Sequence, residues 1–211
     1  MDNLTRKQNE QPYIADEHCA AQMRENARRL YEYNNGDRWS DEGLKKQDER
    51  IRAILGKAGK NLAVMPPFHC DYGYNIAVGD NFYSNYNLII LDVAPVTIGN
   101  NVFIAPNVAI YTAGHPIHHK ARNSMFEYGI SITIGDNCWI GGNTVICPGV
   151  KIGSGVVIGA GSVVTHDIPD NTVAAGNPCK VLREITDNDL KYYFKKREFS
   201  ADELDFIEGA K

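Results

Sequence analysis

A six-residue repeat runs from Ile134 to Pro169 and reads IGDNCW-IGGNTV-ICPGVK-IGSGVV-IGAGSV-VTHDIP. Each block opens with Ile or Val, and Gly takes the second place in four of the blocks. A spacing of six fits neither the 3.6-residue period of a helix nor the two-residue period of an ordinary strand. It is the period of a parallel β-helix, in which each block forms one short strand and one corner. The sequence therefore predicts a mostly β chain folded as a narrow triangular column.

The same frame begins at Val78, is offset by two residues at Pro95–Thr97, and continues to Ile110. Residues 112–131 lack the pattern, so we expect them to form a loop that leaves the column. Four places after each opening residue stands a small or β-branched side chain, which suits a narrow core beside stacked Ile. We expect the intervening Gly and Asn to occupy corners with positive φ. The predicted small inward positions are Val102, Val108, Cys138, Thr144, Val150, Val156 and Ser162.

Two segments ahead of the repeat are predicted to be amphipathic helices. Residues 15–35 carry apolar side chains at steps of three and four and are followed by Gly36, a helix stop. The second helix begins after Ser40, a candidate N-cap, and ends at Gly56. Helices this short bury little surface alone, so we expect them to pack on the column.

The chain is predicted to have three parts: an N-terminal helical segment (1–64), the β-helix (65–185) and a C-terminal helical tail (186–211). Two capping-box patterns, Thr186-x-x-Asp189 and Ser200-x-x-Glu203, indicate helix starts within the tail.

Composition limits the classes of partner. The net charge of −4 over 211 residues argues against a non-specific nucleic-acid surface. The first residues contain no apolar signal region, and no stretch approaches the ~18 apolar residues of a membrane span. The five cysteines contain no C-x-x-C pair, which is typical of reduced thiols. We therefore expect a cytoplasmic protein that binds neither membrane nor nucleic acid.

Four motifs resemble those of the maltose and galactoside O-acetyltransferases, which are hexapeptide-repeat acyltransferases that use acetyl-CoA. They are GHPIHH around His115, NFYSNYN around Asn85, WIGG at Trp139, and VAAGNP near the end of the repeat. The resemblance implies a left-handed parallel β-helix, an exception to right-handed crossovers. It also implies acetyl transfer to a sugar hydroxyl and a homotrimer with active sites between subunits.

Acetyl transfer to an alcohol needs a base for the hydroxyl proton and a donor for the oxyanion that forms. His115 is the candidate base, because imidazole takes up a proton near neutral pH. Asn85 is the candidate oxyanion donor, through a neutral amide. The alternatives are a turn histidine with a structural hydrogen bond and a corner asparagine in the left-handed region.

The resemblance assigns the acceptor side to carboxylates and an aromatic residue. Asp16, Asp71 and Asp92 match positions that accept hydrogen bonds from sugar hydroxyls, and Tyr83 is a further candidate contact. Asp16 is alternatively a charge at the start of a helix, and Asp92 alternatively ends a strand. Glu127 departs from the family, because it replaces an apolar residue that lines the site.

The resemblance places acetyl-CoA along the later coils. Gly142 and Ala160 are small residues that allow close approach of the pantetheine arm, Trp139 borders the thioester end, and charged residues meet the phosphates. Lys180 stands where the galactoside enzymes have arginine. The predicted contacts are Trp139, Gly142, Ala160, Thr165, His166, Lys180 and Arg183.

Three other functions are weighed against this one. A zinc hydratase, like the β-helical carbonic anhydrases, would use His115, His118 and His119, but three ligands on one short loop are unusual and H-E-x-x-H is absent, so no metal site is predicted. A non-catalytic trimeric scaffold is disfavoured by the His115–Asn85 pair. An acetyltransferase acting on an antibiotic hydroxyl differs only in acceptor. Cys138 is predicted to be an inert packing residue, which favours direct attack over an acetyl-enzyme.

Overall fold

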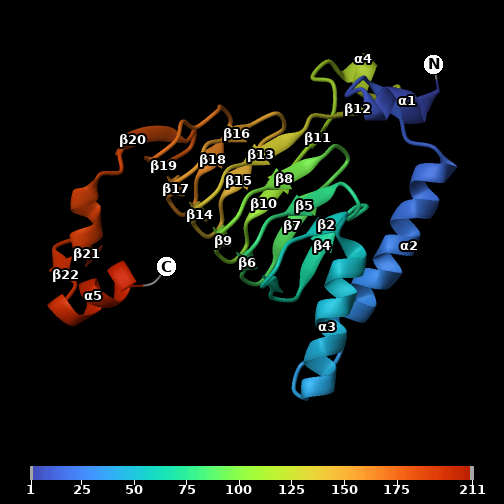
Figure 1. The fold of residues 1–211 in the computed structure, drawn as a ribbon. Helices are drawn as coiled ribbons and strands as arrows, with labels where there is room; N and C mark the ends of the chain where they lie inside the picture. The colour runs from blue at the N-terminus through green and yellow to red at the C-terminus, as the bar shows by residue number, and fades with distance from the viewer. Residues whose placement is uncertain (1, 210–211) are drawn as a thin grey trace.

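The computed structural model describes residues 2–209 and is built on a three-sided column of short parallel strands (Figure 1). Successive strands of the column join the three sheets in turn, so each strand pairs in parallel with strands one coil before and one coil after it. The predicted triangular column is confirmed.

The bounds of the strands are as follows. The first sheet contains β2 (Lys57–Ala58), β5 (Ile76–Val78), β8 (Val96–Ile98), β13 (Ile132–Ile134) and β16 (Lys151–Ile152). The second contains β3 (Ala63–Val64), β6 (Tyr83–Ser84), β9 (Phe103–Ile104), β14 (Trp139–Ile140), β17 (Val157–Ile158), β19 (Thr172–Ala175) and the antiparallel β20 (Lys180–Glu184). The third contains β4 (Phe68–Cys70), β7 (Leu88–Leu91), β10 (Ala109–Tyr111), β15 (Val145–Ile146) and β18 (Val163–Val164).

The column begins before residue 65, the boundary that the sequence suggested. Ala58 pairs with Val78 in the first sheet, and Val64 pairs with Ser84 in the second. These early strands carry neither the large Ile nor the adjacent Gly of the later blocks, so the repeat pattern does not reveal them.

The inward side chains follow the predicted frame. The residues that open the blocks are buried, from Val78 through Ile98 to Val164, and so are all seven predicted small positions. Ile134 pairs with Ile98, and Ile110 pairs with Ile146. Between Ile110 and Ile134 the chain therefore passes from the third sheet directly to the first sheet, which is a single step around the column. The intervening loop adds no coil.

The corners take Asn or Gly where positive φ is needed, and Gly again where two coils approach closely. Eight asparagines adopt positive φ at corners, and their side chains form ladders between coils, as from Asn81 to Asn101 to Asn137. The second-place glycines, in contrast, do not have positive φ. A Cβ on Gly135 would lie 2.7 Å from backbone atoms of the next coil, so close approach excludes a side chain there. The expectation of positive φ is therefore confirmed for the corner asparagines and for the fourth-place glycines from Gly149 to Gly161, and was wrong only for the second-place glycines.

The two predicted helices are present as α2 (Glu17–Asn34) and α3 (Asp41–Ile54), and the Ser40 side chain caps α3 by accepting from the Gly43 N–H. Apolar residues of both helices join the core at the first coil, including Leu30 and Ile51. The Tyr33 hydroxyl donates to the carbonyl of Val64. These contacts close the start of the column.

The predicted loop at residues 112–131, which follows β10, contains regular secondary structure. It contains β11 (Ala113–Gly114), the short helix α4 (His119–Arg122) and β12 (Phe126–Gly129). The N-terminal segment, for which the sequence predicted no structure of this kind, forms α1 (Asn3–Gln8) and β1 (Tyr13–Ile14). These segments build a three-stranded sheet in the order β1-β12-β11.

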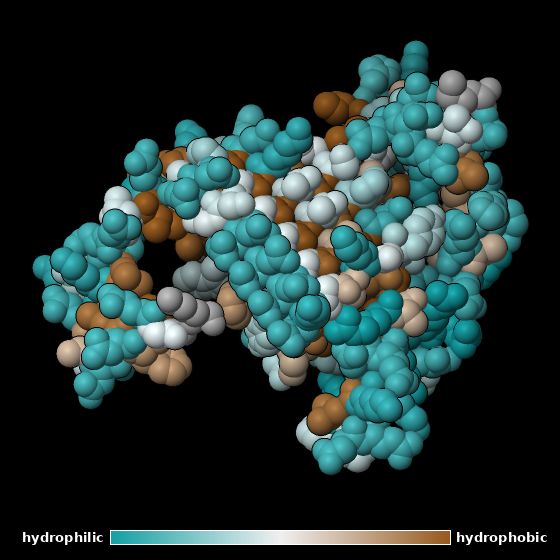
Figure 2. Space-filling view, in the orientation of Figure 1, coloured by the Kyte–Doolittle hydropathy of each residue, from teal (hydrophilic) through white to brown (hydrophobic). Residues whose placement is uncertain are grey.

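The tail is only partly helical. Both predicted capping boxes are present, since the Thr186 N–H donates to Asp189 and the Ser200 N–H donates to Glu203. Between them lies a hairpin of β21 (Tyr192–Phe194) and β22 (Arg197–Glu198), whose aromatic residues favour strands. The boxes open a 3₁₀ helix (187–191) and α5 (Ala201–Gly209), while residues 210–211 lie outside the described part. Figure 2 shows the tail standing off from the column.

Within residues 2–209, no helix combines the length and apolar character needed to cross a membrane.

The ladder at Asn101 should contribute measurably to stability. Replacing Asn101 with Ala removes two interamide hydrogen bonds and places a Cβ-bearing residue without local hydrogen bonding at φ 54°. We expect a loss of about 2 kcal/mol of unfolding free energy, measured by urea denaturation. Asn101→Gly keeps the backbone relaxed and should lose about 1 kcal/mol less. Equal losses in both variants would show that backbone strain of Ala at position 101 makes no contribution.

Candidate active site

Two edges of the column carry most of the predicted site residues. The edge between the second and third sheets, here the Asn85 edge, contains Asn85, Gly142 and Ala160. The edge between the third and first sheets, here the Asp92 edge, contains Asp71, Asp92, Thr165 and His166, and the loop carrying His115 leaves from it.

Asn85 is held by its amide oxygen, and its amide nitrogen has no hydrogen-bond partner within residues 2–209. Its backbone N–H donates to the carbonyl of Ile104, and its side-chain Oδ1 accepts from the Tyr86 N–H at 2.8 Å. Asn85 is not among the asparagines with positive φ, so the interpretation as a left-handed corner residue was wrong. With Oδ1 occupied, the amide of this half-buried side chain retains its Nδ2 donors for another acceptor.

The Asn85 edge continues as a row of small residues. Backbone hydrogen bonds place Ala105, then Gly141, in successive coils above Asn85. Gly142 and Ala160 follow in the same corners, and the Gly161 N–H donates to the Gly142 carbonyl. Gly142 is half-buried and Ala160 is exposed, so this part of the edge is open to close approach.

An aromatic row lies beside this edge on the outer face of the second sheet. Tyr83 pairs with Phe103, which pairs with Trp139. The rings of Tyr83 and Phe103 have centroids 6.2 Å apart. Phe103 and Trp139 are 54% and 56% exposed, which makes this row an apolar surface of the isolated chain.

His115 follows β11 and is held by the hairpin partner of that strand. Its Nδ1 lies 3.1 Å from the carbonyl oxygen of Phe126. A carbonyl only accepts, so the neutral imidazole carries its proton on Nδ1 and leaves the Nε2 lone pair free. Phe126 is itself paired with Ile14 of β1. The N-terminal segment thus supports the carbonyl that orients the predicted base.

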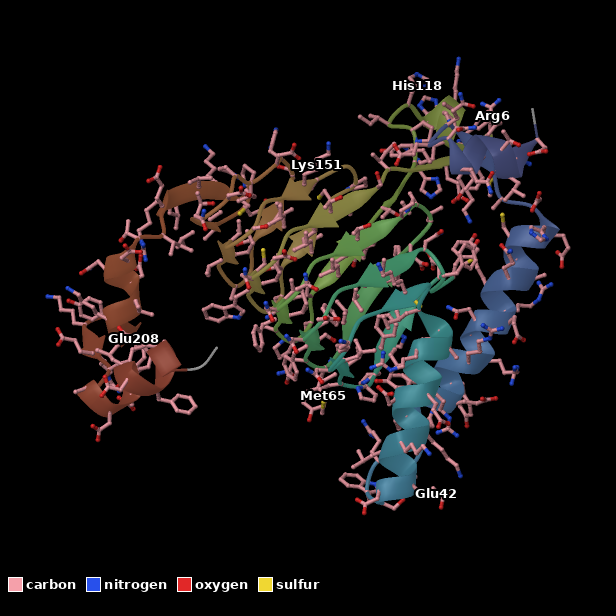
Figure 3. The ribbon with its side chains drawn as sticks, in the orientation of Figure 1. Arg6, Glu42, Met65, His118, Lys151 and Glu208 are labelled. Carbon is pink, nitrogen blue, oxygen red and sulfur yellow. The ribbon has the colours of Figure 1, made fainter. Side chains whose placement is uncertain are left out.

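The predicted catalytic pair is not brought together within one chain. Asn85 precedes β7 of the third sheet, whereas His115 follows β10 of the same sheet, so the sheet separates them. Met65, whose N–H donates to the Ser84 carbonyl next to Asn85, and His118 of the loop lie at opposite sides of the column (Figure 3). The four residues of β7 alone span roughly 13 Å.

Asp92 organises the corner that carries Asp71. Its Oδ1 accepts from the N–H groups of Asp71 and Tyr72 at 3.0 and 2.9 Å. The Asp92 side chain is fully buried, and its Oδ2 has no hydrogen-bond partner within the described residues. Burial raises its pKa to about 6. Direct contact with an acceptor is therefore open to the half-buried Asp71 but not to Asp92 in this conformation.

Asp16 has the structural role that was its alternative. Its Oδ1 caps α2 by accepting from the Cys19 N–H at 3.0 Å, and this bond lowers the pKa of the carboxyl group. The side chain is exposed, so one carboxylate oxygen remains accessible.

The polar residues expected near CoA fall into two groups. His166 and Lys180 line one hollow of about 280 Å³ at the end of the column, and the Thr165 hydroxyl lies 2.9 Å from Nδ1 of His166. Arg183 is instead held by Asp189, with two N–O distances of 2.7 and 2.8 Å. The structure therefore groups His166 with Lys180 but directs Arg183 toward the tail.

Residues 2–209 contain no group of three or more His, Cys, Asp or Glu side chains placed to hold a metal ion. His115, His118 and His119 therefore do not form the ligand set that the zinc alternative needs.

Comparison with known proteins identifies the family. Residues 131–166 match the family described as bacterial transferase hexapeptide (six repeats). The galactoside O-acetyltransferase of Escherichia coli strain K12 is 51% identical over 166 residues, which cover 79% of this chain and 80% of that protein. The chain belongs to the maltose and galactoside O-acetyltransferase family.

Two solved structures of this family resemble the whole fold. A maltose O-acetyltransferase from Clostridium difficile 630 has a TM-score of 0.84 at 46% identity, covering 89% of this chain and 99% of that chain. A galactoside acetyltransferase in complex with coenzyme A has a TM-score of 0.91 at 44% identity, covering 95% and 100%. The expected left-handed β-helix is confirmed, and this member of the family is an acetyl-CoA-dependent O-acetyltransferase.

Some residues that surround the predicted site residues of this acetyltransferase were not found from sequence. Lys7 and Tyr13 are both buried beside the Asp71 corner, delivered by α1 and β1. Nothing in the polar N-terminal segment pointed to the site, apart from the short apolar pair at Tyr13 and Ile14. The support of His115 by Phe126 was also missed, because a backbone carbonyl leaves no mark on the sequence.

The buried carboxyl of Asp92 should make stability depend on pH. Its pKa rises from 3.8 to about 6 on folding, so the folded state binds the proton more tightly. This stabilisation is complete below about pH 4 and is lost as the pH rises to about 6. Relative to Asp92→Asn, the wild type should lose about 1.4 kcal/mol per pH unit across that window. Urea midpoints of both proteins at several pH values test this, and parallel curves would contradict it.

Proposed function

We propose that this acetyltransferase transfers the acetyl group of acetyl-CoA to a hydroxyl of a sugar such as maltose, glucose or a galactoside. In this proposal His115 is the general base and Asn85 donates to the oxyanion. The orientation of His115 by the Phe126 carbonyl carries the proposal, because it fixes the tautomer in which Nε2 accepts a proton.

The proposed reaction is direct attack in a ternary complex. Nε2 of His115 takes the hydroxyl proton as the acceptor oxygen bonds to the thioester carbon. The C–S bond then breaks, and the imidazolium returns its proton to the departing CoA sulfur. No thiol is needed as a nucleophile, since Cys138 is buried and burial raises its pKa.

Asn85 suits the oxyanion role because its Oδ1 is already occupied by the Tyr86 N–H. The amide then cannot turn its oxygen toward the developing negative charge without losing that bond. Its free Nδ2 donors lie on the same edge as the small residues proposed for the pantetheine arm, at Gly142 and Ala160. The neutral amide can donate to the oxyanion without adding a charge to the site.

The proposal includes a homotrimer with active sites between subunits. Supporting it, Asn85 and His115 lie on opposite sides of the third sheet, whereas catalysis requires both near one reacting carbon. A second chain that presents its Asn85 edge to the His115 loop would complete the site. The half-buried Tyr83 and the exposed Phe103 and Trp139 offer an apolar surface beside that edge.

The acceptor is proposed to be polyhydroxylated because carboxylates gather at the Asp71 corner. A panel of sugars and other hydroxylated compounds, read by release of free CoA thiol, tests this class. Turnover confined to a non-sugar alcohol would favour the antibiotic-type alternative. Metal analysis of the purified protein tests the zinc alternative separately.

Loss of the base should abolish most transfer. His115→Ala is expected to lower kcat by about 10²–10⁴-fold, because proton transfer loses its positioned partner. Thiol release measures turnover, and calorimetry should show CoA binding within about twofold of wild type. His18→Ala, an exposed histidine on α2, is the control and should keep full activity. Near-normal turnover in the His115 variant would overturn the assignment.

Loss of the oxyanion donor should also act on kcat. Asn85→Ala is expected to lower kcat by about 10²-fold with little change in the KM for acetyl-CoA. Asn101→Gly removes an asparagine from a corner away from both edges and controls for destabilisation. If Asn85→Ala raised only KM, Asn85 would be a binding residue rather than an oxyanion donor.

A further inference from the structure

Lys7 is a buried lysine beside the corner that carries Asp71 and Tyr72. It is only 7% exposed, whereas lysines are almost never buried unless they are paired. Its Nζ lies 3.4 Å from the centroid of the Tyr72 ring, a cation–π contact. Tyr72 directly follows Asp71, and Asp92 binds the backbone N–H groups of both. The ammonium group therefore sits on the corner that presents Asp71.

The surroundings of Lys7 are rich in negative charge. Burial lowers the pKa of Lys7, and the charges of Asp92, Glu127 and Asp71 act to raise it, although no carboxylate within residues 2–209 forms an ion pair with it inside 4.0 Å. The thiol of Cys19, from α2, is a further neighbour. The Lys7 ammonium group thus acts electrostatically on several carboxylates and forms a close ion pair with none of those described.

Two buried polar groups near Lys7 also lack partners. The hydroxyl of Tyr13 and Oδ2 of Asp92 have no hydrogen-bond partner among the described residues. They come from β1 and from the Asp92 edge, on two sides of the same corner. This is a polar, largely enclosed region with unused hydrogen-bonding capacity, not an apolar contact that happens to cover a lysine.

The charges acting on Asp71 oppose one another. Burial raises the pKa of Asp71, Lys7 lowers it, and Glu127 raises it again. Without the ammonium group, burial and Glu127 would act unopposed, and the protonated form would persist to higher pH. A protonated carboxyl loses acceptor capacity for sugar hydroxyls.

We infer that Lys7 is a positioning residue for the acceptor: its ammonium group, seated on Tyr72, faces Asp71 so that Asp71 binds acceptor hydroxyls as a carboxylate. The inference rests on the proposed function, because it concerns the acceptor of that reaction. It gives α1, on the outside of the column, a role in acceptor selection that is separate from CoA binding.

The test compares Lys7→Met with Lys7→Arg in steady-state assays from about pH 5 to about pH 9, with wild type included. Lys7→Met should raise the acceptor KM roughly tenfold near pH 6 and less near pH 8. The acid limb of kcat/KM for the acceptor should move to higher pH. The KM for acetyl-CoA should not change, and Lys7→Arg should restore most of the acceptor affinity.

The double variant Lys7→Met/Asp71→Asn separates this role from general support of the fold. In the Asp71→Asn background, the Lys7 change should shift the acid limb no further, because the group it acts on no longer titrates. The inference would be overturned if the acid limb did not move in the single variant, or if the KM values for acceptor and acetyl-CoA rose equally. It would also be overturned if the Lys7 change caused the full pH shift in the Asp71→Asn background. If wild type released no thiol with any hydroxyl acceptor, the proposed function would fail, and the inference with it.

Discussion

Hydrogen bonding between successive coils is the constraint on which this structure depends. The strands of the column are so short that almost none of their backbone groups pair within a coil, and each coil relies on its two neighbours. The two ends therefore need covers. At the start α2 and α3 supply them, with Tyr33 donating to the carbonyl of Val64. At the other end β20 pairs antiparallel with β19.

The same constraint explains which parts of the fold could be predicted. Stacked coils must repeat the same inward side chain at the same place, so Ile98, Ile134 and their counterparts reveal the column directly. Ala58 and Val64 lie next to the covering helices, where the core is completed by other side chains, and their strands escape the pattern. The N-terminal segment and hairpin β11–β12 depend on contacts between distant residues, and no local period records such contacts.

The candidate site divides in a similar way. The residue types and motifs lead to His115 and Asn85 as candidates, because the chemistry of acetyl transfer restricts which side chains serve. Their environment does not follow from the motifs. The burial of Asp92, the pairing of Arg183 with Asp189 and the carbonyl that holds His115 all arise from tertiary contacts. A role for a side chain can be proposed from sequence. Only the fold shows whether its hydrogen-bond donors and acceptors are already engaged by other groups.

The single step from Ile110 to Ile134 has a wider consequence. Because the register of the coils is the same on both sides of the inserted loop, changes of length or sequence there leave the spacing of the column, about 4.8 Å per coil, unaltered. Loop-closure entropy grows only slowly with length, so such changes disturb folding little. The coils and the inserted loop can thus vary in sequence independently of one another. The column is a fixed scaffold on which the loop and the N-terminal segment can diverge, while the row of small residues at Gly142 and Ala160 keeps its spacing.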